Sequence, residues 1–384
     1  MTHITIIRHA EAEGNCYRRA HGQYDSLLTP NGEAQCEALR ERFAGTVFDA
    51  VYTSDLYRTR RTASVLCVRD GQPVQPLPAL RELHLGGWED MPWGELAVND
   101  PENLSVFMHS PGRFTRRETS GEAMTEMQSR LFHAVRGLAA AHPDGRIAVV
   151  SHGLAIRALM AALMGLPADR LQEIPHSDNT AVTCIEWDGV QALRVLFHGD
   201  NAHLGALSTL ARQYWWRKDN RIADINLWFR PARLPEEQAA VLDLQRDAWL
   251  AVYGSAAGFL EEISDANNVR MAANHPRAVV FPMAGRETVG LMLLDTELVT
   301  PDNTGHIALI YLTGEARGRA LGAQLIGHAV SVYRKLGRSA LHLCVAEANQ
   351  AARRLYDKAG FYESGREEGL HGALIVMKKD IKVT

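Results

Sequence analysis

Short apolar runs alternate with helical patterns along the first half of the chain. Strands are expected at residues 4–7, 50–53 and 146–150, with helices at residues 31–43, 58–66 and 154–164. Two further strands, at 181–187 and 191–197, are expected to form a pair that turns at Asp188-Gly189. This alternation is typical of an α/β sheet covered by helices on both faces.

The pattern changes between residues 204 and 221, where aromatic and basic side chains mix in the run Tyr214-Trp215-Trp216-Arg217-Lys218. Beyond it, strands are expected at 225–229, 278–281, 288–294, 307–312 and 340–345, helices at 235–253, from 323 onward and at 349–359, and then two closing strands. The chain is therefore predicted to hold a first domain over residues 1–205, a bridging segment over 206–224 and a second domain over 225–384.

Charge and cysteine usage narrow the class of protein. The 384 residues carry a formal net charge of -4 with no long block of one sign, which gives no electrostatic basis for binding nucleic acid or an anionic membrane. The five cysteines form no C-x-x-C pair, so neither a zinc knuckle nor a disulfide framework is expected. With no signal peptide or spanning segment visible, we expect a cytoplasmic protein, monomeric or homodimeric.

Two histidines occupy equivalent places in the predicted first sheet. His9 follows the apolar run 4–7, and His152 follows the apolar run 146–150. Ligand sites in open α/β sheets lie at the carboxyl ends of the strands. One such histidine alone would be equally compatible with a structural role. Two of them, each with basic residues nearby, predict that both imidazoles meet at one phosphoryl group.

Several separated motifs resemble, in the same order, those of the histidine phosphatase (phosphoglycerate mutase-like) superfamily. They are Arg8-His9-Ala10-Glu11, Ser54-Asp55-Leu56-Tyr57-Arg58, Arg81-Glu82-Leu83, Gly121-Glu122 and Ser151-His152-Gly153. The resemblance covers residues 1–205 and implies an α/β fold with a three-layer αβα phosphoglycerate mutase-like sheet. It also implies phosphoryl transfer through a histidine, with no metal required.

The resemblance assigns a role to each residue of this site. His9 is the nucleophile that becomes a phosphohistidine, and Glu82 is the acid that protonates the leaving alcohol. The groups implied to bind the phosphoryl oxygens are Arg8, Arg58 and His152, and those implied to bind the rest of the substrate are Asn15 and Arg19.

Two questions about this site stay open. Glu11 or Asp25 is an alternative proton donor to Glu82. A mutase, which passes the phosphoryl group to a second substrate oxygen instead of water, is the alternative to a phosphatase. Hydrolysis is favoured because no long insertion between Glu82 and His152 is visible of the kind that larger mutases use to enclose a diphosphate.

The second domain contains a glycine-rich turn, 313–322, between a predicted strand and a predicted helix. Such a turn aims several backbone N–H groups at one point and so forms a site for a pyrophosphate. Farther along, a helix carries Asn349 and Tyr356 two turns apart and ends at Gly360.

Together these segments resemble the GNAT family of N-acetyltransferases over residues 225–380. The resemblance implies a mixed α/β sheet splayed between two central strands, with acetyl-CoA as co-substrate and an amine as acceptor. Tyr356 is implied as the acid that protonates the departing thiolate. The implied cofactor-binding residues are Ile310 and Leu312 for the pantetheine arm, Arg317, Gly318, Ala320 and Gly322 in the pyrophosphate loop, and Asn349.

Ala320 departs from the family pattern, because it stands where the family has the first glycine of the loop and its methyl group would crowd the phosphates. His306 is a candidate base for the amine, whose pocket is expected between residues 248 and 274. The prediction is a bifunctional enzyme for a small-molecule phosphate ester and a small-molecule amine. The alternative is a phosphatase regulated by a catalytically silent CoA-binding module.

Overall fold

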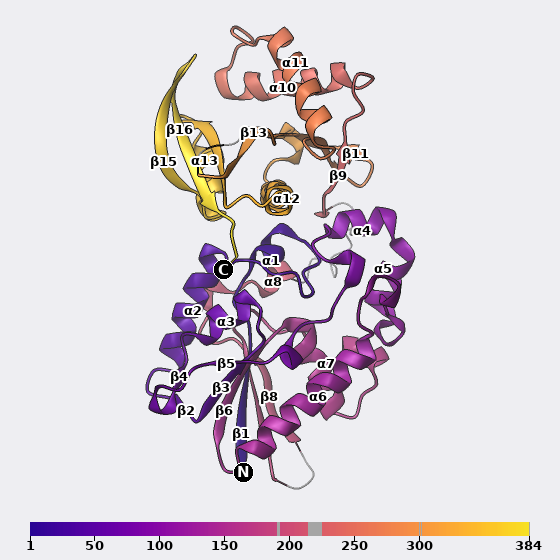
Figure 1. Ribbon diagram of the computed structural model, residues 1–384, viewed down its shortest axis with the longest axis vertical. Coiled ribbons are helices and arrows are strands. Elements are labelled where there is room, and N and C mark those ends of the chain that lie inside the picture. The colour runs from indigo at the N-terminus through magenta and orange to yellow at the C-terminus, as the bar shows by residue number, and fades with distance from the viewer. Residues whose placement is uncertain (190–192, 214–224, 299, 301, 384) are drawn as a thin grey trace.

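The computed structural model describes residues 1–189, 193–213, 225–298, 300 and 302–383, which form two sheet domains stacked end to end (Figure 1). The aromatic and basic run 214–218 of the expected bridging segment lies outside the described residues. Within those ranges, no helix combines the length and the apolar character needed to cross a membrane.

The first domain is built on a six-stranded sheet in the order β5-β3-β6-β1-β7-β8. Its strands are β1 (Thr2–Arg8), β3 (Ala50–Thr53), β5 (Gln75–Pro76), β6 (Arg146–Ser151), β7 (Val182–Trp187) and β8 (Leu193–Asp200), and a separate pair is formed by β2 (Val47–Phe48) and β4 (Cys67–Val68). Its α-helices are α1 (Glu13–Tyr17), α2 (Pro30–Arg42), α3 (Tyr57–Ala63), α4 (Trp93–Asn99), α5 (Pro101–His109), α6 (Met124–Ala141), α7 (Gly153–Leu163) and α8 (Leu210–Gln213).

The central strands β1 and β6 are buried on both faces, because apolar side chains of each strand point into cores on both sides of the sheet. Ile6 and Val149 point into a core shared with α6 and α7, whereas Ile7 and Val150 point into a second core shared with α2 and α3. The sheet is thus covered by helices on its two sides, as Figure 1 shows. This arrangement confirms the three-layer αβα fold expected for the first domain.

The register of β1 on β6 fixes the two histidines relative to each other. The strands pair in parallel from His3↔Arg146 to Arg8↔Ser151. The N–H of His9 then donates to the carbonyl of Ser151 at 2.9 Å. Because both strands end at this level, His9 and His152 leave the same edge of the sheet side by side.

The second domain is built on an eight-stranded sheet in the order β11-β10-β12-β13-β14-β16-β15, with β9 added on β10. Its strands are β9 (Trp228–Pro231), β10 (Val279–Ala284), β11 (Glu287–Thr288), β12 (Gly290–Asp295), β13 (Thr304–Leu312), β14 (Ala340–Ala346), β15 (Tyr362–Gly369) and β16 (Gly372–Asp380). Its helices are α10 (Gln238–Tyr253), α11 (Glu261–Asn274), α12 (Gly322–Lys335) and α13 (Gln350–Lys358).

The sheet of the second domain divides between two central strands. β13 pairs in parallel with β14 only over Thr304–His306, although β13 continues to Leu312. On its other side β13 stays paired with β12 up to Leu312. The two central strands therefore separate beyond His306, which agrees with the mixed, splayed sheet expected here.

Residues 225–227, expected to begin a strand, are instead bound by a side chain of α12. Gln324 accepts a hydrogen bond from the N–H of Leu227 at 2.8 Å and donates one to the carbonyl of Ile225 at 2.9 Å. These backbone groups are satisfied without a neighbouring strand, so β9 begins only at Trp228.

Helices α1 and α12 join the two domains. Tyr17 of α1 is buried in the core of the second domain, against Gly327, where an added Cβ would lie 2.5 Å from the Cβ of Tyr17. Glu13, whose side chain is 2% exposed, forms ion pairs with Arg334 at 2.6 Å and with Lys379 at 3.2 Å. A buried apolar contact with desolvated ion pairs holds two domains in one arrangement better than a wet, polar interface does.

Replacing Glu13 with glutamine should destabilise the whole chain. The change leaves the two cations buried without their counter-charge, a loss worth about 3–5 kcal/mol in comparable buried pairs. Urea unfolding of the full chain measures it. Glu37→Gln is the matched control, because Glu37 pairs with Arg40 on an exposed face of α2 and its loss should leave the free energy of unfolding essentially unchanged. Equal effects of the two substitutions would contradict this account of the interface.

Candidate functional site

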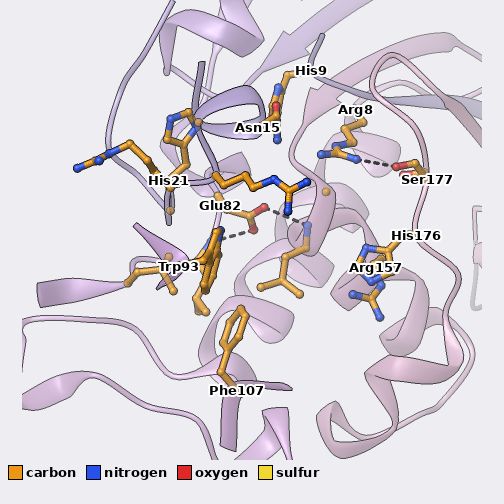
Figure 2. A pocket seen from close by; sticks show the side chains of 18 of the residues that line it. Arg8, His9, Asn15, His21, Glu82, Trp93, Phe107, Arg157, His176 and Ser177 are labelled. Carbon is orange, nitrogen blue, oxygen red and sulfur yellow. Dashed lines mark hydrogen bonds between the residues drawn. The ribbon is translucent and has the colours of Figure 1, made fainter. Parts of the chain in front are cut away.

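A cavity of about 640 Å³ opens at the carboxyl edge of the first sheet (Figure 2). Four of the catalytic residues predicted from the sequence line it: Arg8, His9, Arg58 and Glu82. His152 lies against His9, with the ring centroids 5.2 Å apart. The structure thus gathers four of these side chains around one cavity and places the fifth, His152, in contact with His9.

His9 is held in one tautomer. Its Nδ1 lies 2.7 Å from the carbonyl oxygen of Ala10, and because a carbonyl only accepts, Nδ1 carries the hydrogen. Burial, followed by the nearby charges of Arg58 and Arg8, holds the pKa of His9 well below its usual range. The ring is therefore neutral at pH 7, with the lone pair on Nε2, which is the form that a nucleophile requires.

His152 is fully buried, and within the described residues neither of its ring nitrogens has a hydrogen-bond partner. Burial, Arg58 and His9 hold its pKa well below the usual value. An unpartnered buried polar atom costs free energy unless a ligand satisfies it. A phosphoryl oxygen bound next to His9 would provide that partner.

Two arginines are fixed in place by backbone carbonyls. Arg8 donates to the carbonyl of Ser177 at 2.6 Å, and Arg58 donates to the carbonyls of Tyr24 at 2.9 Å and Gly22 at 2.7 Å. Burial lowers the pKa of both guanidinium groups, which nevertheless stay charged in proteins. Fixed cations inside a cavity stabilise the charge of a phosphoryl group without having to reorganise.

The carboxylate of Glu82 lies against the first turn of α7. Its carboxylate accepts hydrogen bonds from the N–H groups of Leu154 at 3.0 Å and Ala155 at 2.9 Å. Burial raises the pKa of Glu82, and this effect outweighs the opposing hydrogen bonds and the charge of Arg58. A carboxyl group with a raised pKa keeps its proton closer to neutral pH, as a general acid needs to do.

The alternative proton donors have other partners. Glu11 lines the cavity and accepts from the hydroxyl of Thr29 at 2.7 Å. Asp25 accepts from the N–H of Tyr57 through both oxygens, at 2.9 and 3.0 Å, and is not among the residues that line the cavity. Glu82 and Glu11 thus both line the cavity, whereas Asp25 does not.

Asn15 and Arg19 line the cavity, and each already makes hydrogen bonds within the protein. The side-chain oxygen of Asn15 accepts from the N–H of Ala12 at 3.0 Å, which caps the start of α1. Arg19 donates to Asp90 at 2.7 Å and to the hydroxyl of Ser331, in the second domain, at 2.9 Å. Arg19 thus ties the cavity wall to the second domain.

The predicted pyrophosphate loop leads from β13 to the N-terminus of α12. An added Cβ at Gly318 would meet nothing within 4 Å, so the loop borders open space. Ala320 has φ +58°, a conformation that favours glycine. This backbone geometry explains why the family pattern has glycine there, and it leaves the Ala320 side chain exposed.

The strand edge expected to bind the pantetheine arm lies beside this loop. Ile310 and Leu312 belong to the part of β13 that has separated from β14. Arg317 folds back on this edge, because its Nε donates to the carbonyl of Leu312 at 3.0 Å and its guanidinium lies 5.5 Å from the ring centre of Tyr311. Gly322 is the first residue of α12.

Asn349 and Tyr356 lie at the two ends of α13. Asn349 is the N-cap, and its side-chain oxygen accepts from the N–H of Ala352 at 3.1 Å, so this oxygen serves the helix. Tyr356 is 7% exposed and packs against Phe361. Burial raises the pKa of Tyr356 to about 12, which keeps its phenol protonated at neutral pH.

His306 lies at the point where β13 and β14 separate. Its Nδ1 is 2.9 Å from Nε2 of His342, the residue paired with it on β14. Burial, with the neighbouring His342, lowers the pKa of His306 to about 4. His306 is therefore neutral at pH 7, and its hydrogen bond to a second imidazole was not apparent from the sequence.

Comparison with known proteins decides the family. A family model for the histidine phosphatase superfamily (branch 1) matches residues 4–199, just over half of the chain. The chain belongs to this superfamily. A model for the acetyltransferase (GNAT) family matches residues 239–361, which confirms the resemblance inferred for the second domain.

Relatives of the histidine phosphatase domain include proteins named as probable phosphoglycerate mutase GpmB. The protein from Serratia proteamaculans is 35% identical over 168 residues, 44% of this chain and 77% of the relative. The protein from Escherichia fergusonii is 31% identical over 210 residues, 54% of this chain and 96% of the relative. Among solved structures, Bacillus stearothermophilus YhfR is similar with a TM-score of 0.50 and 33% identity, covering 53% of this chain and 99% of that chain.

Several residues that line the cavity of the histidine phosphatase domain were not predicted from the sequence. Trp93 and Phe107 stack with ring centroids 5.8 Å apart, and in Figure 2 they extend away from Glu82. Arg157 and His176 line another side. They come from helices and loops far apart in the chain, without a shared motif, so no local signal marked them.

Proposed function

We propose that the first domain hydrolyses phosphate monoesters through a phosphohistidine on His9. The observation that carries the proposal is the convergence of neutral His9, two buried arginines and protonatable Glu82 on one cavity, with unpartnered His152 packed against His9. This set provides a nucleophile, a charge-stabilising shell and an acid within one site.

Two displacements account for the reaction. In the first, Nε2 of His9 forms a bond to phosphorus while the bond from phosphorus to the alcohol oxygen breaks, and Glu82 gives that oxygen its proton. In the second, Glu82 takes a proton from water, the water oxygen bonds to phosphorus, and the phosphorus–nitrogen bond breaks to release inorganic phosphate. Arg8, Arg58 and His152 stabilise the charge on the phosphoryl oxygens in both steps.

A mutase is the second candidate, because the relatives described above are named as probable phosphoglycerate mutases. Hydrolysis is favoured because a cavity of about 640 Å³ leaves room for a water molecule beside the bound ester. Release of inorganic phosphate from a panel of esters, with no phosphorylated cofactor added, tests the proposal. Isomerisation of phosphoglycerate that depends on an added diphosphate, without phosphate release, would establish the mutase instead.

For the second domain we propose acetyl transfer from acetyl-CoA to a small-molecule amine. The open loop at Gly318, the start of α12 at Gly322 and the free edge of β13 fit this cofactor. When bound, acetyl-CoA supplies the acetyl group as a thioester. Backbone groups of Ile310 and Leu312 would hold the pantetheine arm, and Tyr356 would hold the proton that the leaving thiolate needs.

Tyr356→Phe removes only a hydroxyl and should lower acetyl transfer by about a hundredfold, the contribution of a general acid. Calorimetric titration with CoA should show unchanged binding. The control is Tyr362→Phe, on an exposed part of β15, which should leave both quantities as they are. Full transfer activity in Tyr356→Phe would make Tyr356 a packing residue. Tight CoA binding by the unmodified protein without transfer to any amine would favour the CoA-sensing module.

A further inference from the structure

The cavity of the phosphatase site is lined by residues of both domains. Ala320, in the predicted pyrophosphate loop, and Ala323, in the first turn of α12, belong to its lining together with His9 and Glu82. Gly14 of α1 belongs to the lining as well. The acetyltransferase domain therefore supplies part of the wall around the phosphatase site.

This wall is held firmly against the first domain. The hydroxyl of Ser331 on α12 hydrogen-bonds to Arg19 at 2.9 Å and to Asp90, which is buried in the first domain. The pair Glu13–Arg334 adds a second tie between α1 and α12. If α12 moved away from the cavity, these contacts would break and the buried charged groups would lose their partners. The free-energy cost of that loss opposes opening of the domain contact.

The aromatic side of the cavity is tied to the second domain as well. Trp93 opens α4, and the next residue, Gly94, packs so closely on Leu227 that an added Cβ would lie 2.5 Å from its carbonyl oxygen. Glu95 of the same helix pairs with Arg277 at 2.8 Å. Two separate walls, one aromatic and one of small methyl groups, thus depend on the acetyltransferase domain for their position.

The size of the cavity shows what these walls can contact. Its volume of about 640 Å³ lies within the range of about 300–1,000 Å³ typical of sites for drug-sized ligands. A phosphoryl group on a three-carbon acid fills only a small part of that space. The stacked rings of Trp93 and Phe107 offer a flat apolar surface to a planar group.

We propose that the acetyltransferase domain completes the binding site for the alcohol part of the phosphatase substrate, with Ala320 and Ala323 as specificity-determining residues. The substrate class is then a phosphate monoester of a bulky alcohol with a planar, largely apolar group. This proposal rests on the proposed phosphatase function. It goes further by making the phosphatase specificity a property of both domains together.

The experiment enlarges the side chain at the wall. Ala323→Leu, in the full chain, is titrated by calorimetry with methylphosphonate, phenylphosphonate and 1-naphthylphosphonate, whose phosphorus–carbon bonds resist hydrolysis. Binding of the naphthyl compound should weaken about tenfold, as expected for added methylene groups in an apolar pocket, with methylphosphonate binding unchanged. Hydrolysis of the corresponding phosphate esters should lose kcat/KM in the same order of size.

Two further variants secure the result. Ala351→Leu makes the same change at an exposed position of α13 and should leave all three affinities unchanged. Ala323→Met has a more flexible side chain, and it replaces Ala323→Leu if thermal melting shows that the leucine variant is unfolded. It should show the same order of effects with size.

The outcomes distinguish the proposed wall at Ala323 from the proposed hydrolysis through His9. A loss that grows with the size of the phosphonate supports the wall, and it does so even if no ester is hydrolysed, a result that would reject only the proposed hydrolysis. Equal losses for all three phosphonates, or no loss in either Ala323 variant, would overturn the wall while leaving hydrolysis through His9 intact.

Discussion

His9→Ala is expected to reduce the release of inorganic phosphate by at least about a thousandfold, because removal of a nucleophile leaves only the residual effect of substrate binding and charge stabilisation. The structure explains why no neighbour takes over. His152 packs against His9, but it is fully buried and, unlike His9, is not among the residues that line the cavity. The measurement is kcat for an ester that the unmodified protein hydrolyses, together with trapping of phosphorylated protein from a radiolabelled ester.

The matched control is His133→Ala, on an exposed position of α6, which should keep full activity and full labelling. His9→Ala should lose the label and still transfer acetyl groups, because His9 has no role in the proposed acetyl transfer. An acid-labile phosphoryl group on the His9→Ala protein would show that another side chain is the nucleophile.

The part of this site that follows from the sequence is the part set by strand ends. The apolar runs of β1 and β6 predict two strands, and a histidine after each predicts a meeting point that the register Arg8↔Ser151 then fixes. The pattern of apolar positions and the parallel pairing of the two strands are enough to predict that the histidines meet. The prediction of α12 from an apolar stripe succeeds for the same reason.

Other parts depend on contacts that no local pattern encodes. Arg19 is predicted to bind substrate, and its contacts are with Asp90, 71 positions away, and Ser331, 312 positions away. Helix α11 was not predicted because only Asn268 and Met271 are buried along it, so its sequence lacks an apolar stripe. The aromatic pair likewise arises only when α4 packs on α5, and the wall from α12 only when the two domains dock.

Glu82→Gln is expected to lower kcat by about a hundredfold to ten-thousandfold with alkyl phosphates, because an amide has nearly the same shape as the carboxyl group but cannot give a proton to the leaving oxygen. The loss should be much smaller with 4-nitrophenyl phosphate, whose leaving group departs as a stable anion. Burial raises the pKa of Glu82 from the ordinary 4.5. The acid must be protonated, so kcat/KM of the unmodified protein should fall as pH rises through that raised pKa.

In Glu82→Gln this alkaline decline should disappear, since no titrating group remains at that position. Glu41→Gln, on an exposed position of α2, is the matched control and should retain both the rate and the pH profile. Measuring kcat/KM from pH 4 to pH 9 for one alkyl and one nitrophenyl ester checks both expectations. Equal losses for the two esters would show that Glu82 organises the start of α7 without donating the proton. Glu11, the other carboxylate that lines the cavity, would then be the donor to test.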